Sequence, residues 1–202
     1  IVEPTEIYLR KDPDNNLSFV SPDLQFYSID TDGVGGKDCI NTYLTQFPQI
    51  DDLTIRVQGN TTFLGNFEFL DRGDKKVILK TEPTEQKLGP AVIRYTNGIA
   101  RSTDLQNIIQ IENIIIASNF GPGSSLVSNS LSLKFKVINS ILLIGGDILI
   151  DNKTESSLVM INSFVIFAYS GTGNKVCLLK KTINDGSTII SNSAFFVSKD
   201  YD

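Results

Sequence analysis

Carboxylates are the side chains of this sequence that could perform chemistry on an outer face of a fold. Hydrolysis of a glycosidic bond needs two carboxyl groups at a suitable separation. The candidates are Glu112, Asp147 and Asp151, of which the two aspartates flank a short apolar segment at a spacing of four. No two recurring columns place acids in register, so we interpret these residues as solvated charges and turn caps and assign no catalytic residue.

Other catalytic and ligand-binding chemistries lack the residues they need. The chain contains no histidine, which excludes Ser-His-Asp and Cys-His catalysis and most zinc sites. The GVGG segment at 33–36 precedes an expected helix without the buried strand of a dinucleotide-binding motif, and we interpret it as a tight turn. Cys39 and Cys177 lie far apart and are interpreted as buried free thiols. The sequence predicts no metal and no cofactor.

A pattern centred on asparagine recurs four times and indicates how the chain is organised. The centres are Asn113, Asn139, Asn162 and Asn192. Apolar residues stand two before and two and four after each centre, and the intervals are 26 (113 to 139), 23 (139 to 162) and 30 (162 to 192) residues. Alternation predicts two short strands in each copy, and asparagine tolerates the left-handed backbone angles of a corner between them. Such intervals are typical of stacked coils, so we expect the four asparagines to form a buried, stacked structural corner.

The pattern extends toward the N-terminus. Residues 55–63 fit it with Gly59 in the corner position, and the distance to Asn113 leaves room for one further coil. We expect the strands of that coil at 77–80 and 92–95, with residues 82–90 as a loop between them. Apolar residues at spacings of three and four predict a short amphipathic helix over 37–47.

Short, regularly spaced strands joined by polar turns predict an all-β fold, a β-solenoid or alternatively a β-sandwich or jelly roll. Asp32-Gly33-Val34, the helix at 37–47 and LTIRVQG at 53–59 together resemble the opening of pectin-lyase-like proteins, a group that includes phage tailspikes and many polysaccharide-degrading enzymes. The resemblance implies a right-handed parallel β-helix with a short N-terminal capping helix. The run of Thr and Asp common after the turn glycine in that group is missing here. We expect residues 31–202 to form the β-helix domain and residues 1–30 an extended lead-in.

An apolar column is expected on the outer surface. Three residues after the four asparagines stand Ile116, Leu142, Val165 and Phe195, which uninterrupted alternation predicts to point outward. The column three before each asparagine changes from Gln110 and Lys136 to apolar residues toward the C-terminus. An exposed apolar stripe usually marks an interface, and elongated solenoids can bury one by packing side by side around a symmetry axis. The column therefore predicts a homotrimer interface, unless loops or residues 1–30 cover it.

The composition of the chain limits the classes of binding partner that we expect. The formal charge of −5 and the pI near 4.8 argue against nucleic acid, since binding phosphates needs clustered Lys and Arg. No apolar run reaches the roughly 20 residues of a membrane-spanning helix. We therefore expect a homo-oligomer, other virion or surface proteins and carbohydrate as partners, and a location in a virion or on an extracellular surface.

Three functions are compatible with these features. The first is a structural or attachment protein of a virion, namely a homotrimeric spike, fibre or capsid-associated component that binds host surface glycans. The second is a polysaccharide lyase or glycoside hydrolase of the pectin-lyase-like kind, which would need acids clustered on one face. The third, a bacterial surface adhesin, shares the predicted fold of the first and cannot be separated from it by sequence.

Overall fold

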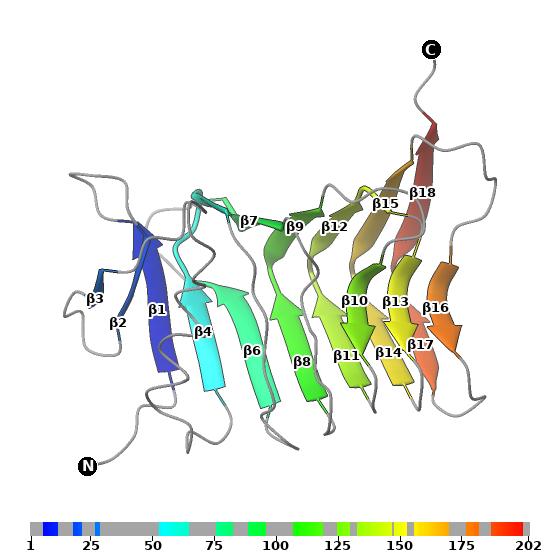
Figure 1. The fold of residues 1–202 in the computed structure, drawn as a ribbon, viewed down its shortest axis with the longest axis horizontal. Coiled ribbons are helices and arrows are strands. Elements are labelled where there is room, and N and C mark those ends of the chain that lie inside the picture. The colour runs from blue at the N-terminus through cyan, green and yellow to red at the C-terminus, as the bar shows by residue number, and fades with distance from the viewer. Residues whose placement is uncertain are drawn as a thin grey trace.

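The computed structural model describes thirteen segments of the chain, within which every regular element is a strand. These segments are residues 6–11, 18–21, 27–28, 53–64, 76–82, 89–95, 107–118, 125–129, 133–146, 148–152, 156–169, 177–181 and 187–199. Successive coils stack along one axis and their strands form three sheets, so the architecture is a parallel β-helix, as the sequence predicts (Figure 1). The expected helix at 37–47, Asp32-Gly33-Val34, Cys39, Asp147 and the loop at 83–88 lie outside the described residues.

Each coil contributes one strand to each sheet it visits. Sheet A contains β1 (Glu6–Lys11), β2 (Ser18–Ser21), β3 (Tyr27–Ser28), β4 (Leu53–Val57), β6 (Lys76–Thr81), β8 (Asn107–Glu112), β11 (Leu133–Ile138), β14 (Ser156–Ile161) and β17 (Thr188–Ser191). Sheet B contains β5 (Thr62–Leu64), β7 (Ala91–Tyr95), β9 (Ile114–Ser118), β12 (Ile141–Ile144), β15 (Phe164–Tyr169) and β18 (Ala194–Lys199). Sheet C contains β10 (Ser125–Asn129), β13 (Ile148–Asn152) and β16 (Cys177–Lys181). Strands β6 and β7 are the further coil expected before Asn113.

The corners between sheets A and B are built from asparagines with positive φ. Asn60, Asn113, Asn139, Asn162 and Asn192 have φ between 46° and 53°, the left-handed region that favours asparagine over other non-glycine residues. Parallel pairing aligns Glu112 with Ile138, and Ile138 with Ile161, so successive asparagines occupy one column. In the first coil the corner residue is Asn60, not Gly59 as the sequence pattern suggested.

Hydrogen bonds tie each corner to the next. The backbone N–H of Asn113 donates to Ile138 O at 3.0 Å, that of Asn139 to Ile161 O at 3.0 Å, and that of Asn162 to Ser191 O at 3.1 Å. The asparagine side chains are exposed, so the expectation of buried amides is wrong. The amide of Asn192 nevertheless donates to Asn162 Oδ1 at 2.6 Å, as a stacked pair.

A serine ladder lies on the inner side of the corners. It consists of Ser140, Ser163 and Ser193, each directly after a corner asparagine. The Oγ of Ser163 accepts the N–H of Ser140 at 3.2 Å and donates to Ile161 O at 2.8 Å. Ser140 and Ser163 are 2% and 0% exposed, so each hydroxyl satisfies a backbone N–H that water cannot reach. In the three C-terminal corners the repeated unit is therefore Asn-Ser rather than an asparagine alone.

The N-terminal strand is part of the solenoid. Strand β1 pairs in parallel with β4, and Leu9 is fully buried in the common core. Strands β2 and β3 continue sheet A with antiparallel pairing. The segment 1–30, expected as a separate lead-in, thus contributes to the β-helix through β1, because the apolar alternation of Ile7-Tyr8-Leu9 suits one more strand of the sheet.

Candidate interaction surface

The residues predicted to form an outward interface point into the core. Ile116, Leu142 and Val165 are each 0% exposed, and Phe195 is partly buried against the same cluster. The prediction that this column faces outward is therefore wrong. The residues of this column nevertheless lie in register across sheet B, as the pairs Leu142 with Ile116 and Val165 with Phe195 show.

The left-handed corner explains the error. Before the corner, residues two and four positions ahead of the asparagine are buried, as Val137 and Phe135 are around Asn139. After the corner the buried residues are one and three positions on, as Ser140 and Leu142 are. An uninterrupted strand would keep even positions on one side. A residue with positive φ turns the chain and shifts this alternation by one position.

The shift places a different set of apolar side chains on the outside. We define the sheet-B outer face as the residues two and four positions after each corner asparagine. Its members are Ile115, Ile141, Phe164, Ala194, Ala117, Leu143, Ile166 and Phe196.

All eight side chains of the sheet-B outer face are partly or fully exposed, with Phe164 at 45% and Phe196 at 52%. The two phenylalanine rings stack with their centroids 6.3 Å apart and an interplanar angle of 23°. Toward the N-terminal coils the same columns become polar, at the exposed residues Thr62 and Arg94. Val92, in register with Ile115, is still apolar, so the apolar character fades along the N-terminal coils rather than ending at β9.

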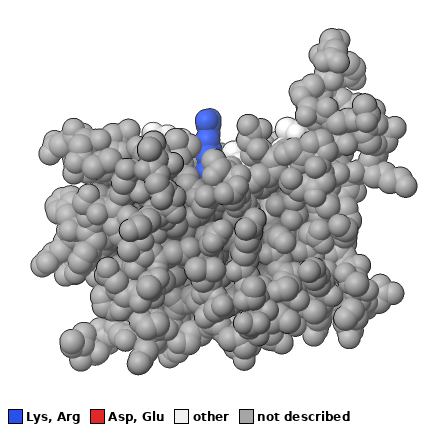
Figure 2. All heavy atoms as spheres, in the orientation of Figure 1, with Lys and Arg blue, Asp and Glu red and all other residues white. Residues whose placement is uncertain are grey.

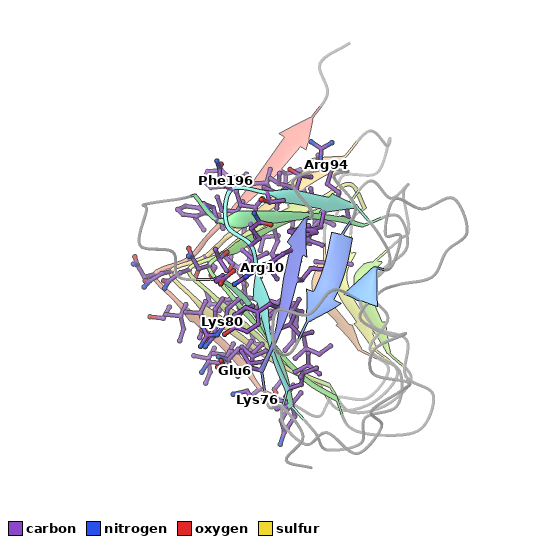
Figure 3. The ribbon with its side chains drawn as sticks, turned by 90° about the vertical axis from the view of Figure 1, so that its left-hand side faces the viewer. Glu6, Arg10, Lys76, Lys80, Arg94 and Phe196 are labelled. Atoms are coloured by element: carbon purple, nitrogen blue, oxygen red, sulfur yellow. The ribbon has the colours of Figure 1, made fainter. Side chains whose placement is uncertain are left out.

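Figures 2 and 3 place this surface on the molecule. In Figure 2 the described side chains are visible along the upper edge, where sheet B runs in Figure 1. They consist of one basic side chain and uncharged atoms. In Figure 3 Arg94 and Phe196 lie at this upper edge, whereas Glu6, Lys76 and Lys80 project from sheet A. The labelled charged residues of the N-terminal coils therefore lie mainly on sheet A, with Arg94 on sheet B.

The outer face of sheet A is charged in the N-terminal coils. Arg56 donates to both carboxylate oxygens of Glu6, at 3.0 and 2.8 Å. The hydrogen bond from Arg56 lowers the pKa of Glu6 below its ordinary value, and Glu6 in turn raises that of Arg56.

A second ion pair links β1 to the end of β6. Arg10 bonds both carboxylate oxygens of Glu82, through Nε at 3.1 Å and through Nη2, and its guanidinium lies 4.8 Å from the ring centroid of Tyr8. Farther along sheet A the outward column three before each corner ends at Ile189, which is 56% exposed. Gln110, earlier in the same column, is only 6% exposed.

The candidate acids do not converge on one place in the described structure. Glu112 points outward on β8 and accepts a hydrogen bond from Gln110, and Asp151 lies on β13 of sheet C. Glu6 and Glu82 are each held by an arginine. Within the described segments no group of three His, Cys, Asp or Glu residues could hold a metal ion.

One sequence signal could have revealed the inner side of the corners. Serine follows three of the four asparagines, and Thr61 follows Asn60 and donates to Gly59 O at 3.1 Å in the same way as the serines. A small hydroxyl residue repeated at one position of a strand indicates a ladder that serves the backbone.

Comparisons with known proteins do not assign the chain to a family. Among the described residues no helix has the length and apolar character to cross a membrane. No protein-family model, curated protein or solved structure matches the chain.

Proposed function

We propose that the chain is a structural or attachment component of a virion, of the spike, fibre or capsid-associated kind, which assembles as a homotrimer through the sheet-B outer face. The observation that carries the proposal is the continuous run of eight outward apolar side chains over β9, β12, β15 and β18. The resemblance of residues 30–200 to tailspike-like β-helices adds to it.

The apolar and partly exposed character of the surface favours a subunit contact. Exposed apolar patches above about 400 Å² are unusual on monomers and mark interaction sites. Burial contributes about 25 cal/mol per Å², so such a patch would stabilise association by roughly 10 kcal/mol before the costs of association. Packing around a threefold axis would cover the same face on every subunit while leaving the charged face of sheet A in solvent.

Light scattering on the purified chain tests the proposal. The wild-type protein should have the mass of a trimer. Ile166→Lys places a charge in the middle of the sheet-B outer face and should give monomers. Val159→Lys, on the outer face of sheet A, is the matched control and should remain trimeric. A wild-type monomer at every concentration, or equal effects of the two variants, contradicts the proposal.

The attachment role has its own test. A glycan array probed with labelled trimer should give selective binding to a small set of surface glycans without release of shorter products. Release of reducing ends or of unsaturated sugars from a polysaccharide would instead favour the carbohydrate-active enzyme. A trimer that binds no glycan retains the structural role and loses the attachment role.

A further inference from the structure

Four lysines of sheet A, two of them far from the other two in the sequence, are brought together by the stacking of coils. We define the lysine strip as Lys76 and Lys80 of β6 with Lys134 and Lys136 of β11. Strand β8 lies between β6 and β11, and its residue Ile108 pairs with both Lys76 and Lys134. The lysines alternate with buried residues of their strands, so all four project from the outer face, as Lys76 and Lys80 do in Figure 3.

The carboxylates of this face do not neutralise the lysine strip. The two ion pairs formed by the described residues of sheet A use arginines, and neither involves Lys80, Lys134 or Lys136. Glu112 pairs with Lys80 in the strand register, but its carboxylate accepts a hydrogen bond from the amide of Gln110. Even with Glu112 set against Lys80, the two lysines of β11 leave an excess of positive charge on a chain whose formal charge is −5.

Uncharged side chains fill the space between the lysines. Ile78 and Ile108 are half-buried, and Gln110 is 6% exposed. Neighbouring coils are about 4.8 Å apart, so β6 and β11 are separated by about 10 Å. Along β11, Lys134 and Lys136 are about 7 Å apart. The strip therefore combines widely spaced positive charges with small apolar areas between them.

We propose that the lysine strip binds an acidic glycan. Carboxylate or sulfate groups would accept charge-assisted hydrogen bonds from the lysines, while nonpolar faces of the sugar rings lie against Ile78 and Ile108. This inference rests on the attachment role proposed above and adds to it the class of glycan and the place of binding. The strip lies on sheet A, so the glycan and the trimer contact on the sheet-B outer face occupy different surfaces.

The spacing of the charges favours a glycan over a nucleic acid. Duplex DNA carries one negative charge per about 1.7 Å of its axis, which is far denser than lysines about 7–10 Å apart. The net negative charge of the chain also opposes the approach of so dense a polyanion. An acidic glycan with one charged group on each sugar, or on every second sugar, separates its charges by whole rings, as the strip does.

A matched pair of oligosaccharides tests the proposal. The probe is a fluorescent chondroitin sulfate decasaccharide, which carries carboxylates and sulfates, and the control is its desulfated and carboxyl-reduced form, which is neutral. Fluorescence anisotropy with the full chain should show binding of the acidic probe at least about tenfold tighter than that of the neutral one. Added salt should weaken binding of the acidic probe, because it screens exposed charges.

Two protein variants locate the binding. Lys136→Gln should weaken binding of the acidic probe at least about fivefold, whereas Arg94→Gln, which removes an exposed cation from sheet B, should change it by less than about twofold. Circular dichroism and light scattering show whether each variant keeps the fold and the assembly of the wild type. Lys134→Gln repeats the measurement on the same strand.

Three results would overturn the proposal: equal binding of the two oligosaccharides, equal effects at 136 and 94, or binding of duplex DNA or phosphatidylserine vesicles as tight as that of the acidic probe. The last result would mean that the surface attracts any polyanion. The trimer is tested separately. A monomer that binds the acidic probe through Lys136 contradicts only the trimer, and a trimer that does not distinguish the two oligosaccharides contradicts only the glycan site.

Discussion

The two ends of the described solenoid are finished differently although their inner columns are alike. At the N-terminal end, Leu9 and Leu53 are 0% exposed, and β2 and β3 extend sheet A with antiparallel pairing. At the C-terminal end, the inward-facing residues Ile190 and Val197, which pair with the buried Met160 and Phe167, remain exposed. The difference shows that a side chain in a stacked fold is buried by its neighbouring coil as much as by its own strand.

The outer surfaces change along the same axis. The N-terminal coils carry the Glu6–Arg56 and Arg10–Glu82 ion pairs on sheet A and Arg94 on sheet B. The C-terminal coils carry apolar side chains on both outer faces. The charged side chains of the N-terminal coils are well solvated and disfavour edge-to-edge association. The apolar side chains of the C-terminal coils offer surfaces for contact.

The largest expected effect on stability concerns the inner column that contains Met160, which is buried between coils, and Ile190, which is partly exposed in the last coil. Met160→Ala should lower the free energy of unfolding by about 2–5 kcal/mol, because it leaves a cavity between coils. Ile190→Ala, in register one coil later, should cost less than about half as much, since its side chain is already partly in water. Urea denaturation measures both. Equal losses would mean that the last coil is covered in solution.

Removal of one serine of the ladder should have the next largest effect. Ser163→Ala leaves the buried N–H of Ser140 without an acceptor and should cost about 1–3 kcal/mol. Ser157→Ala, on the outer side of β14, is the matched control and should stay within about 0.5 kcal/mol. Thermal unfolding followed by circular dichroism compares the two. A harmless Ser163→Ala would show that the ladder does not support the corners.

A corner substitution separates backbone strain from side-chain contacts. Asn139→Ala should cost about 1–2 kcal/mol, because alanine disfavours the φ of 48° at this position. Asn139→Gly should cost less, since glycine adopts positive φ without strain. The alanine and glycine substitutions at Asn60 test whether positive φ has the same cost at the N-terminal corner. If glycine is as harmful as alanine at both corners, the amide side chain and not the backbone angle matters.

The smallest effect is expected at the charged end. The lowered pKa of Glu6 means that its ion pair stabilises the fold above the ordinary carboxyl pKa, and that this contribution is lost as the pH falls through the lowered value. Glu6→Gln should therefore destabilise the protein at neutral pH by less than about 1 kcal/mol, because the pair is partly exposed. Denaturation midpoints across the acid range should converge for the two proteins. A constant difference at all pH values would assign the effect to packing.

The spacing of the asparagines and the alternation around them were enough to predict stacked coils. The direction of the side chains after each corner was not, because residues 114–116 are three consecutive isoleucines, which fit either alternation. A single positive φ decides between the two, and no pattern of apolar residues reports it. The corner at Asn60 was misplaced to Gly59 for a related reason, since both residue types tolerate that conformation.

The central claim is that the corner asparagines of adjacent coils lie directly above one another, and an engineered disulfide tests it. Parallel neighbouring strands are separated by about 4.8 Å, a Cα distance that a disulfide can bridge. Asn139→Cys combined with Asn162→Cys should form a mutual disulfide under mild oxidation, identified by peptide mapping. Asn113→Cys combined with Asn162→Cys, two coils apart, should remain unlinked to each other. Failure of the adjacent pair to form a disulfide, or equal linkage of the distant pair, would contradict the stacked β-helix and every surface derived from it.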